Sequence, residues 1–410
     1  MVARSNWATK RLGDLAEFRN GVNYNKSSFG EGMKVVGVAD FQDYTKPRYD
    51  ELAQINPDGI ITERNILRDG DIVFVRSNGN RELIGRSLLI EAPPEVVTHS
   101  AFTIRLRFIS RDISPKFYAY CFRTPLIRKA LTAYGGGANI SNLNQDILSA
   151  LEVPIPPLPV QQKIAAVLSS YDELIENNQR RIWTLENMAR ALYWEWFVKF
   201  KVPSHEKTEL VGSSLGPIPR NWELKQLAEL VGLNKGRKPE ETWKESRNGD
   251  VPLLLIDTLR GGEPEFTTPE KMIIAEKRDT IMVMDGASSC EVMQGFVGAV
   301  GSTLGRFRTV APDRFSPHAL FCFLIMKREE FKSKNTGAAI PHANKDYILG
   351  QQVPLPPVGL MVRFNDMMEP IQSAIENFKS QIQNLRRTRD LLLPRLLSGQ
   401  VDLKCLCVKG

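Results

Sequence analysis

Long apolar runs are missing from this chain of 410 residues. The longest one, from Ala319 to Met326, is far shorter than the roughly 18 residues that a membrane-spanning helix needs. The first residues also lack the continuous apolar stretch of a secretory signal peptide. The sequence therefore predicts a cytoplasmic protein that has no membrane partner.

Cysteine and histidine are scarce, with five scattered cysteines and four isolated histidines. A disulfide framework needs paired cysteines, and a zinc site needs clustered ligands. We therefore predict neither disulfides nor a metal site.

Motifs of nucleotide and methyl-transfer chemistry are missing as well. The chain contains no [Asn/Asp]-Pro-Pro-aromatic loop, which amino-methyltransferases use to hold the target amine, and no G-x-x-x-x-G-K-[ST] phosphate loop. We predict no catalytic residues and no cofactor in this chain, so it is not expected to be an enzyme.

Charge and composition leave binding functions open. Apolar residues make up 42% and charged residues 25% of the chain, as in ordinary globular proteins, and the net charge is +7. A basic balance permits a polyanionic partner, but no segment is a polybasic tail. Any nucleic acid must therefore be bound by side chains arranged on a folded surface.

An internal repeat determines the predicted architecture. The segment 153–157 (Val-Pro-Ile-Pro-Pro) recurs as 353–357 (Val-Pro-Leu-Pro-Pro), and the segment 71–75 resembles 279–283. Residues on both sides of the first proline segment match residues the same distance further along the chain. Gly137, Ala138, Ile140, Asn144, Asp146 and Ile175 match Gly337, Ala338, Ile340, Asn344, Asp346 and Ile375. The chain thus reads as two diverged copies of one unit.

Each copy has a variable body, a proline hinge and a charged helical stretch. The bodies alternate short apolar runs with Gly, Asn and Pro turns, which indicates mixed α and β structure. We predict an α+β fold with bodies at 1–155 and 205–357, a central long helix at 156–204, and a distal long helix and tail at 358–410.

Both helical stretches carry an apolar seam. Apolar residues recur at alternating spacings of four and three, which is typical of coiled coils. The seams run from Ile164 to Trp196 and from Phe364 to Leu396. We expect the two helices to pair antiparallel within one chain. Asn178 and Arg389 interrupt the seams, either because they fix the register or because the helices splay there and expose them to solvent.

Three segments carry a family resemblance. Residues 153–164, the Trp-Glu-Trp-Phe-Val-Lys-Phe run at 194–200 and residues 391–399 resemble the specificity subunit of type I restriction-modification systems. The resemblance implies that each body is a target recognition domain for one half of an asymmetric, bipartite site in double-stranded DNA. It implies that the helices hold the halves apart and dock two methyltransferase (M) subunits.

The resemblance also implies where the chemistry lies. S-adenosylmethionine, ATP and Mg, with adenine methylation, translocation and cleavage, would belong to the M subunits and the restriction (R) subunits of the assembled complex. A different class of function stays open from the residues alone, namely a coiled-coil adaptor that binds proteins and not DNA.

Candidate DNA contacts follow from the donor and acceptor patterns that base reading needs. A loop after the 71–75 strand offers Arg76, Ser77, Asn78, Asn80 and Arg81, and the chemically different segment 284–289 at the equivalent place offers Ser288 and Ser289. An ordinary solvated hairpin is the alternative.

Two further loops are candidates for phosphate or base contacts. The glycine-rich segment 135–142 offers Asn139, Ser141 and Asn142, and its copy offers Asn335, Thr336 and His342. A basic turn adds Lys235, Arg237 and Lys238. The alternatives are a loop that only packs the body on its hinge, and solvated surface charge.

Aromatic residues gather at the end of the first long helix. They are Tyr193, Trp194, Trp196 and Phe197. Clusters of this kind are enriched in interface cores, so we predict docking of an M subunit here. Packing against the neighbouring helix or body is the competing interpretation, and we expect the cluster to serve both uses.

Overall fold

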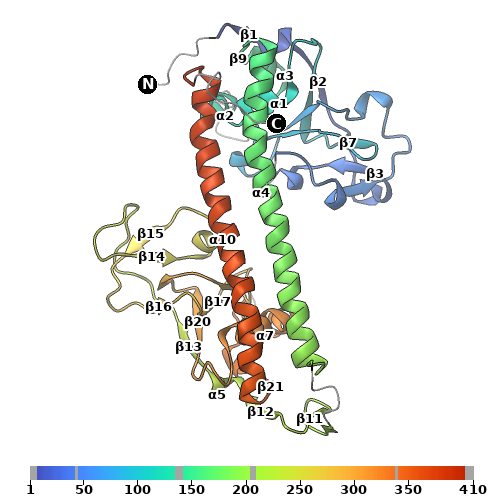
Figure 1. The fold of residues 1–410 in the computed structure, drawn as a ribbon. Helices are drawn as coiled ribbons and strands as arrows, with labels where there is room; N and C mark the ends of the chain where they lie inside the picture. Colours follow the sequence, from blue (N-terminus) through green and yellow to red (C-terminus); the bar gives the residue numbers. More distant parts are fainter. Residues whose placement is uncertain (1–6, 42–44, 134–141, 204–208, 338–339, 402–410) are drawn as a thin grey trace. The chain divides into compact units, whose positions relative to one another are not determined.

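A computed structural model describes residues 7–41, 45–133, 142–203, 209–337 and 340–401 (Figure 1). The chain divides into two compact units. The first contains Met1–Glu176 and Ile382–Gly410, and the second contains Asn177–Gln381. Each unit thus combines one body with a part of both long helices, and each is described by itself below.

In its described residues, the first body has two larger sheets, a two-stranded sheet and three short α-helices. Its four-stranded antiparallel sheet has the order β2 (Ala16–Asn20), β8 (Thr103–Phe108), β5 (Ile72–Val75), β6 (Ser87–Leu89). A three-stranded sheet has the order β4 (Ala53–Ile55), β3 (Phe29–Val36), β7 (Val97–His99). The helices are α1 (Pro115–Cys121), α2 (Pro125–Ala133) and α3 (Gln145–Ala150). β1 (Thr9–Arg11) pairs with β9 (Glu152–Pro154) beside the hinge.

The second body repeats this plan. Its four-stranded antiparallel sheet has the order β13 (Val231–Lys235), β20 (Leu304–Thr309), β17 (Thr280–Val283), β18 (Val292–Gln294). A second sheet has the order β15 (Glu265–Thr267), β14 (Val251–Leu254), β19 (Gly298–Val300), β16 (Ile274–Ala275). The helices include α7 (Pro317–Met326) and α9 (Lys345–Leu349), and β12 (Glu223–Gln226) pairs with β21 (Gln352–Leu355). The predicted duplication of an α and β body is confirmed.

The same capping signals start equivalent helices in both bodies. Ser114 and Ser316 accept hydrogen bonds from the third residue of α1 and α7, and each is followed by proline. Asn144 and Asn344 cap α3 and α9 in the same way. Because a side-chain oxygen at this position satisfies an otherwise unpaired backbone N–H, these residues fix where each helix begins.

A buried ion pair repeats as well. Asp71 is fully buried and accepts two hydrogen bonds from Arg107, at 2.7 and 2.6 Å. Asp279 does the same with Arg308, also at 2.7 and 2.6 Å. Each carboxylate lies at the start of a central strand and each arginine lies on the adjacent strand, so the pair joins the sheet to the loop before it.

Two long helices follow the proline segments. α4 (Leu158–Tyr193) continues into a π-helical turn (Trp194–Val198), and α10 spans Val358–Leu397. In the first unit, Ile164 and Leu168 share a core with Leu393 and Leu396. In the second unit, Tyr193 of α4 lies against Phe364 of α10. Early residues of one helix therefore meet late residues of the other, as the antiparallel prediction requires.

The polar seam residues are paired rather than splayed. Asn178 is only 5% exposed and donates to Oε1 of Gln381 at 3.1 Å within the second unit. Arg389 donates to Oδ1 of Asp172 at 2.5 Å within the first unit, and Tyr120 donates to the other oxygen of Asp172. Because each pair forms only at one alignment of the helices, the register interpretation is favoured over solvent exposure.

An ionic cluster attaches the second body to α10. Arg278, next to β17, pairs with Glu369 and Glu376 of α10, and the buried His318 of α7 lies 2.8 Å from Glu369. Hydrogen bonds from Arg278 lower the pKa of Glu369 to about 2. Burial lowers the pKa of His318, because desolvation disfavours the imidazolium.

The buried aspartates generate a stability prediction. Asp71→Asn should lower the free energy of unfolding of the first body by about 3 kcal/mol, because Arg107 loses its charged partner in a mostly buried site. Thermal unfolding should show a fall in Tm of several degrees. Asp58→Asn, which makes the same charge change at an exposed position of that body, should leave Tm unchanged. Equal Tm values for both variants would contradict the assignment.

The ionic cluster generates a pH prediction. Because the folded pKa values of Glu369 and His318 lie below their unfolded values, the unfolded chain binds more protons, and stability falls as pH falls. The Glu369 contribution is complete above about pH 4.5 and is lost toward pH 2. Tm measured from pH 7 to pH 3 should fall less steeply below pH 5 for Glu369→Gln than for the wild type. A parallel fall would refute the assignment, and the exposed Glu223→Gln is the control.

Candidate DNA-recognition edges

Three segments of the second body meet at one edge of its four-stranded sheet. β13 ends at Lys235, Asp285 follows β17, and a loop returns through Pro341 and His342. Backbone bonds fix this meeting, because Gly286 N–H donates to the Pro341 carbonyl at 2.9 Å and Ala343 N–H donates to the Met284 carbonyl at 2.7 Å. The loop is therefore held in place by main-chain contacts, which leave its side chains free to vary.

Asp285 joins Lys235 and His342 at this edge. Its Oδ2 lies 2.9 Å from Nζ of Lys235, and its Oδ1 lies 2.7 Å from Nδ1 of His342. Partial burial opposes ionisation, but hydrogen bonds from His342 and Lys235 outweigh it and hold the pKa of Asp285 below its ordinary value. The carboxylate thus stays charged between two donors.

The first body has an equivalent edge with unlike chemistry. Leu143 N–H donates to the Arg76 carbonyl at 2.9 Å, as Ala343 does to Met284. By this correspondence, Ser77 takes the place of Asp285 and Asn142 takes the place of His342. Asn20, the last residue of β2, takes the place of Lys235, and its Oδ1 accepts from Gln145 at 3.2 Å. Neutral amide and hydroxyl side chains therefore stand where the second body has an ammonium, a carboxylate and an imidazole.

A close backbone approach supports the matching of Asn20 with Lys235. A Cβ atom added to Gly21, which follows Asn20, would lie 2.2 Å from the carbonyl oxygen of His99. A Cβ atom on Gly236, which follows Lys235, would lie 2.2 Å from the carbonyl oxygen of Gly301. Only glycine fits at either position, so both strands leave the sheet by the same path.

The arginine and asparagine loop of the first body is folded by its own side chains. Oδ1 of Asn78 accepts from the backbone of Asn80 at 2.7 Å, and Oδ1 of Asn80 accepts from Glu82 at 3.0 Å. Arg76 and Ser77 are partly buried, and Asn80 is exposed. Arg81 begins a short 3-10 helix, Arg81–Leu83. The exposed parts of this loop, together with the exposed Asn142, form the first candidate edge; Asn139 and Ser141 lie outside the described residues.

The basic turn of the second body is on the surface. Lys235, Arg237 and Lys238 are exposed, and Arg237 donates to the backbone carbonyl of Lys271 at 3.0 Å. Thr336 is also exposed and exchanges two backbone hydrogen bonds with His342, at 2.9 and 2.8 Å. These residues share the second candidate edge with Asp285.

One predicted contact needs correction. Ser289 is only 1% exposed, and its hydroxyl accepts a hydrogen bond from Asn335 at 2.5 Å. Asn335 also accepts from the thiol of Cys290, whose backbone adopts a positive φ of 68°. Ser289 and Asn335 therefore hold the loop together. The buried Ser289 is not placed to contact DNA directly, whereas Asn335 is partly exposed and stays a candidate contact. Ser288 is partly exposed and accepts from Arg260 at 3.0 Å.

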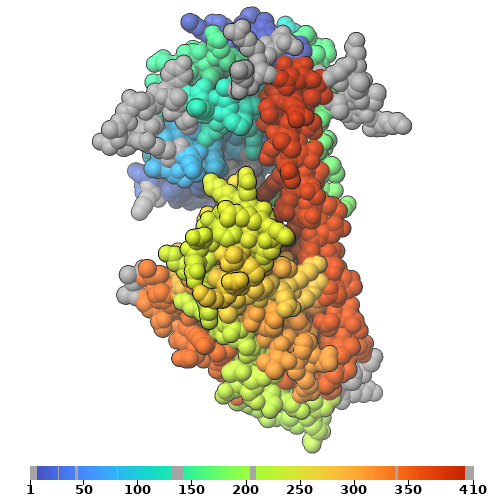
Figure 2. Space-filling view, turned by 90° about the vertical axis from the view of Figure 1, so that its left-hand side faces the viewer, coloured from blue at the N-terminus to red at the C-terminus, as the bar shows by residue number. Residues whose placement is uncertain are grey.

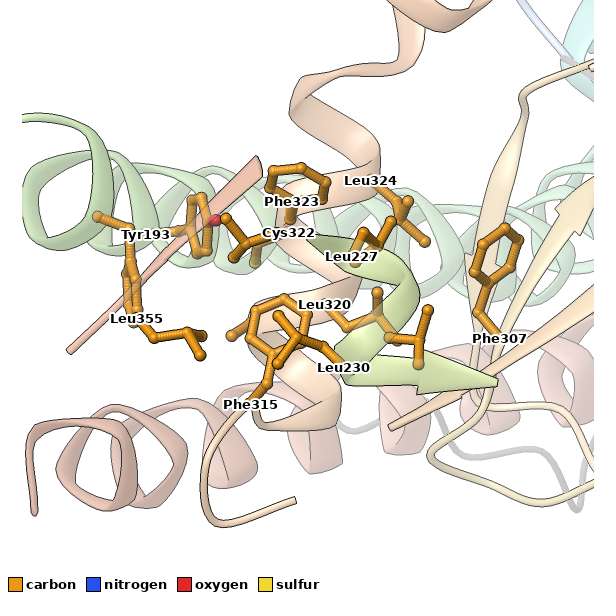
Figure 3. Packing of buried hydrophobic residues seen from close by; sticks show 14 of the residues in the cluster. Tyr193, Leu227, Leu230, Phe307, Phe315, Leu320, Cys322, Phe323, Leu324 and Leu355 are labelled. Atoms are coloured by element: carbon orange, nitrogen blue, oxygen red, sulfur yellow. The ribbon is translucent and has the colours of Figure 1, made fainter. Parts of the chain in front are cut away.

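The aromatic cluster also needs correction. Tyr193, Trp196 and Phe197 are at most 4% exposed and belong to the core of the second unit. Figure 3 shows Tyr193 among Leu355, Cys322 and Phe323. These three aromatics are therefore not available for subunit docking, and the packing alternative holds for them. Trp194 alone of the four is exposed, at 43%.

Two residues of interest are not among the predicted ones. Asp285 carries one usable signal in the sequence, its position directly after a predicted strand. Trp183 of α4 is 65% exposed, and nothing in the heptad pattern marked it. Figure 2 shows that the second body leaves one side of α10 uncovered as well.

Two features are absent from the residues that the structure describes. No group of three or more His, Cys, Asp or Glu side chains is arranged to hold a metal ion there. Within the same ranges, no helix has the length and apolar character to cross a membrane.

Two duplicated bodies with unlike edges, each packed on parts of two long helices, define a protein built by internal repetition. The family described as Type I restriction modification DNA specificity domain matches residues 4–187 and 219–385, so the chain belongs to that family. It is a type I restriction-modification specificity subunit, as the sequence resemblance predicted.

Individual specificity subunits are also similar to this chain. The putative MjaX specificity subunit of Methanocaldococcus jannaschii is 24% identical over 412 aligned residues, 97% of this chain and 94% of the relative. The MjaIX specificity subunit of the same organism is 25% identical over 311 residues, 72% of each chain. The crystal structure of a type I S subunit from M. genitalium covers 96% of both chains with a TM-score of 0.58 at 16% identity, which supports the fold.

The corrected aromatic cluster yields a prediction. Trp196→Ala should lower Tm markedly, because truncating a buried Trp costs about 3 to 5 kcal/mol. Trp194→Ala should change Tm by less than one degree, since its side chain is largely exposed. Thermal unfolding of the two variants tests the assignment, and a Trp194→Ala variant as unstable as Trp196→Ala would contradict it.

Proposed function

We propose that this chain reads a bipartite, asymmetric DNA site for a type I restriction-modification complex, with one body for each half. The carrying observation is the chemistry of the two edges. Equivalent backbone positions hold Lys235, Asp285 and His342 in one body and neutral residues in the other. Unlike half-sites require unlike donor and acceptor patterns on a common scaffold.

The paired helices support a second part of this proposal. Asn178 with Gln381 and Arg389 with Asp172 fix one register of α4 on α10. A fixed register would set the distance between the bodies, and so the length of the DNA spacer. The exposed side of the helices would dock two M subunits, with the exposed Trp183 and Trp194 as candidate contacts.

The remaining chemistry belongs, in this proposal, to partners. The M subunits would bind S-adenosylmethionine and transfer the methyl group, and the R subunits would use ATP and Mg. The absence of methyltransferase and phosphate-loop motifs from the sequence supports this division. A cytoplasmic location follows from the same proposal, since the chromosome is the substrate.

Binding can be tested directly. The complex reconstituted with its M subunits should bind one duplex in preference to scrambled duplexes, and its affinity should fall steeply with salt, because phosphate contacts release counterions. Fluorescence anisotropy at several salt concentrations measures both properties. Equal affinity for all duplexes, or an affinity insensitive to salt, would favour a protein-binding adaptor instead.

The spacer can be tested by shortening both helices. Removing one facing heptad from α4 and from α10 shortens the pair by about 10 Å, equivalent to roughly three base pairs at 3.4 Å each. Methylome sequencing should then show a shorter spacer with both half-sites unchanged. Removing a heptad from one helix only is the control, because it breaks the register pairs and should abolish methylation. New half-sites with the old spacer would refute the proposal.

A further inference from the structure

Among the residues that the structure describes, Asp285 is the one acid that pairs with Lys235 or with His342 at the second edge. Lys235 and His342 are both about half exposed, whereas the Asp285 side chain is 20% exposed. The carboxylate therefore lies behind its two partners. It holds them while their outer atoms remain accessible to a ligand.

The hydrogen bond selects the tautomer of the neutral His342 ring. A carboxylate can only accept, so Nδ1 of His342 carries the proton in this contact at 2.7 Å. In the neutral ring, Nε2 then presents a lone pair. A lone pair at this position can accept from the exocyclic amine of adenine or cytosine in the major groove. Without Asp285, either nitrogen could carry the proton, and the edge would lose this selectivity.

The contact also restricts Lys235. A lysine side chain has several rotatable bonds and three donors, so an unrestrained ammonium contacts any nearby phosphate. The 2.9 Å pair with Asp285 limits the positions of Nζ. In addition, a carboxylate next to the basic turn repels phosphates wherever base contacts do not compensate, which is a means of rejecting wrong sequences.

We propose that Asp285 is a positioning residue that determines specificity for the half-site read by the second body. It orients Lys235 and His342 toward bases and weakens binding to other sequences. This inference rests on the proposed DNA-reading function. It goes beyond it, because it assigns discrimination in one half-site to a residue that makes no base contact itself.

The test uses the complex with its M subunits and a duplex identified by methylome sequencing. Asp285→Asn should raise the affinity for duplexes altered in the second half-site several-fold. It should not raise the affinity for the correct duplex, so the ratio of the two affinities, correct over altered, should fall several-fold. Discrimination in the first half-site should stay unchanged. Glu223→Gln makes the same charge change at an exposed ion pair with Arg314 in the same body and should keep the ratio.

The outcomes separate the possible roles. If both affinities rise equally and the ratio holds, Asp285 only repels DNA and the inference is wrong. Asp285→Glu should restore part of the affinity ratio of correct over altered duplexes. His342→Gln should lower this ratio for the second half-site alone. These two variants guard against the possibility that Asp285→Asn misfolds. If the wild-type complex itself shows no sequence preference, the DNA-reading function fails, and that result is distinguishable from failure of this inference.

Discussion

The antiparallel pairing of α4 with α10 is the constraint on which both units depend. Neither body forms its core alone, because α4 contributes Ile164 and Leu168 to the first core and Tyr193 and Trp196 to the second. An apolar seam by itself tolerates sliding by one heptad. The pairs of Asp172 with Arg389 and of Asn178 with Gln381 remove that freedom, since a slipped register would leave buried polar groups without partners.

The duplication explains why so much of the fold is predictable from the sequence. Signals that act locally occur twice and act the same way each time: prolines end the bodies, Ser114 and Ser316 cap one helix, and Asn144 and Asn344 cap another. The 3.5-residue periodicity identified both long helices because they bury one stripe only. Structural features that recur in both copies and depend only on residues nearby in the chain can be predicted from the sequence.

The errors share a physical cause. Periodicity shows that Tyr193, Trp196 and Phe197 are apolar at helical spacing, but it cannot show whether a body of the same chain or another subunit covers them. Ser289 looks like a surface hydroxyl because its neighbours are turn residues. It is buried because Asn335, far along the chain, crosses over it. Packing between residues far apart in the chain decides which side chains are exposed. Residue type alone therefore does not identify the side chains that can contact a partner.

The asymmetry between the edges follows from the same division between scaffold and surface. Asp71 with Arg107 and Asp279 with Arg308 are kept in both bodies because each joins a strand to the loop before it, and a change in either partner leaves a charge without its counterion. No such restraint acts on Ser77 and Asp285, because backbone hydrogen bonds already hold their loops. Side chains there can diverge without loss of the fold. A duplicated body can therefore acquire two different surfaces, provided that divergence is confined to positions whose main chain is fixed by other contacts.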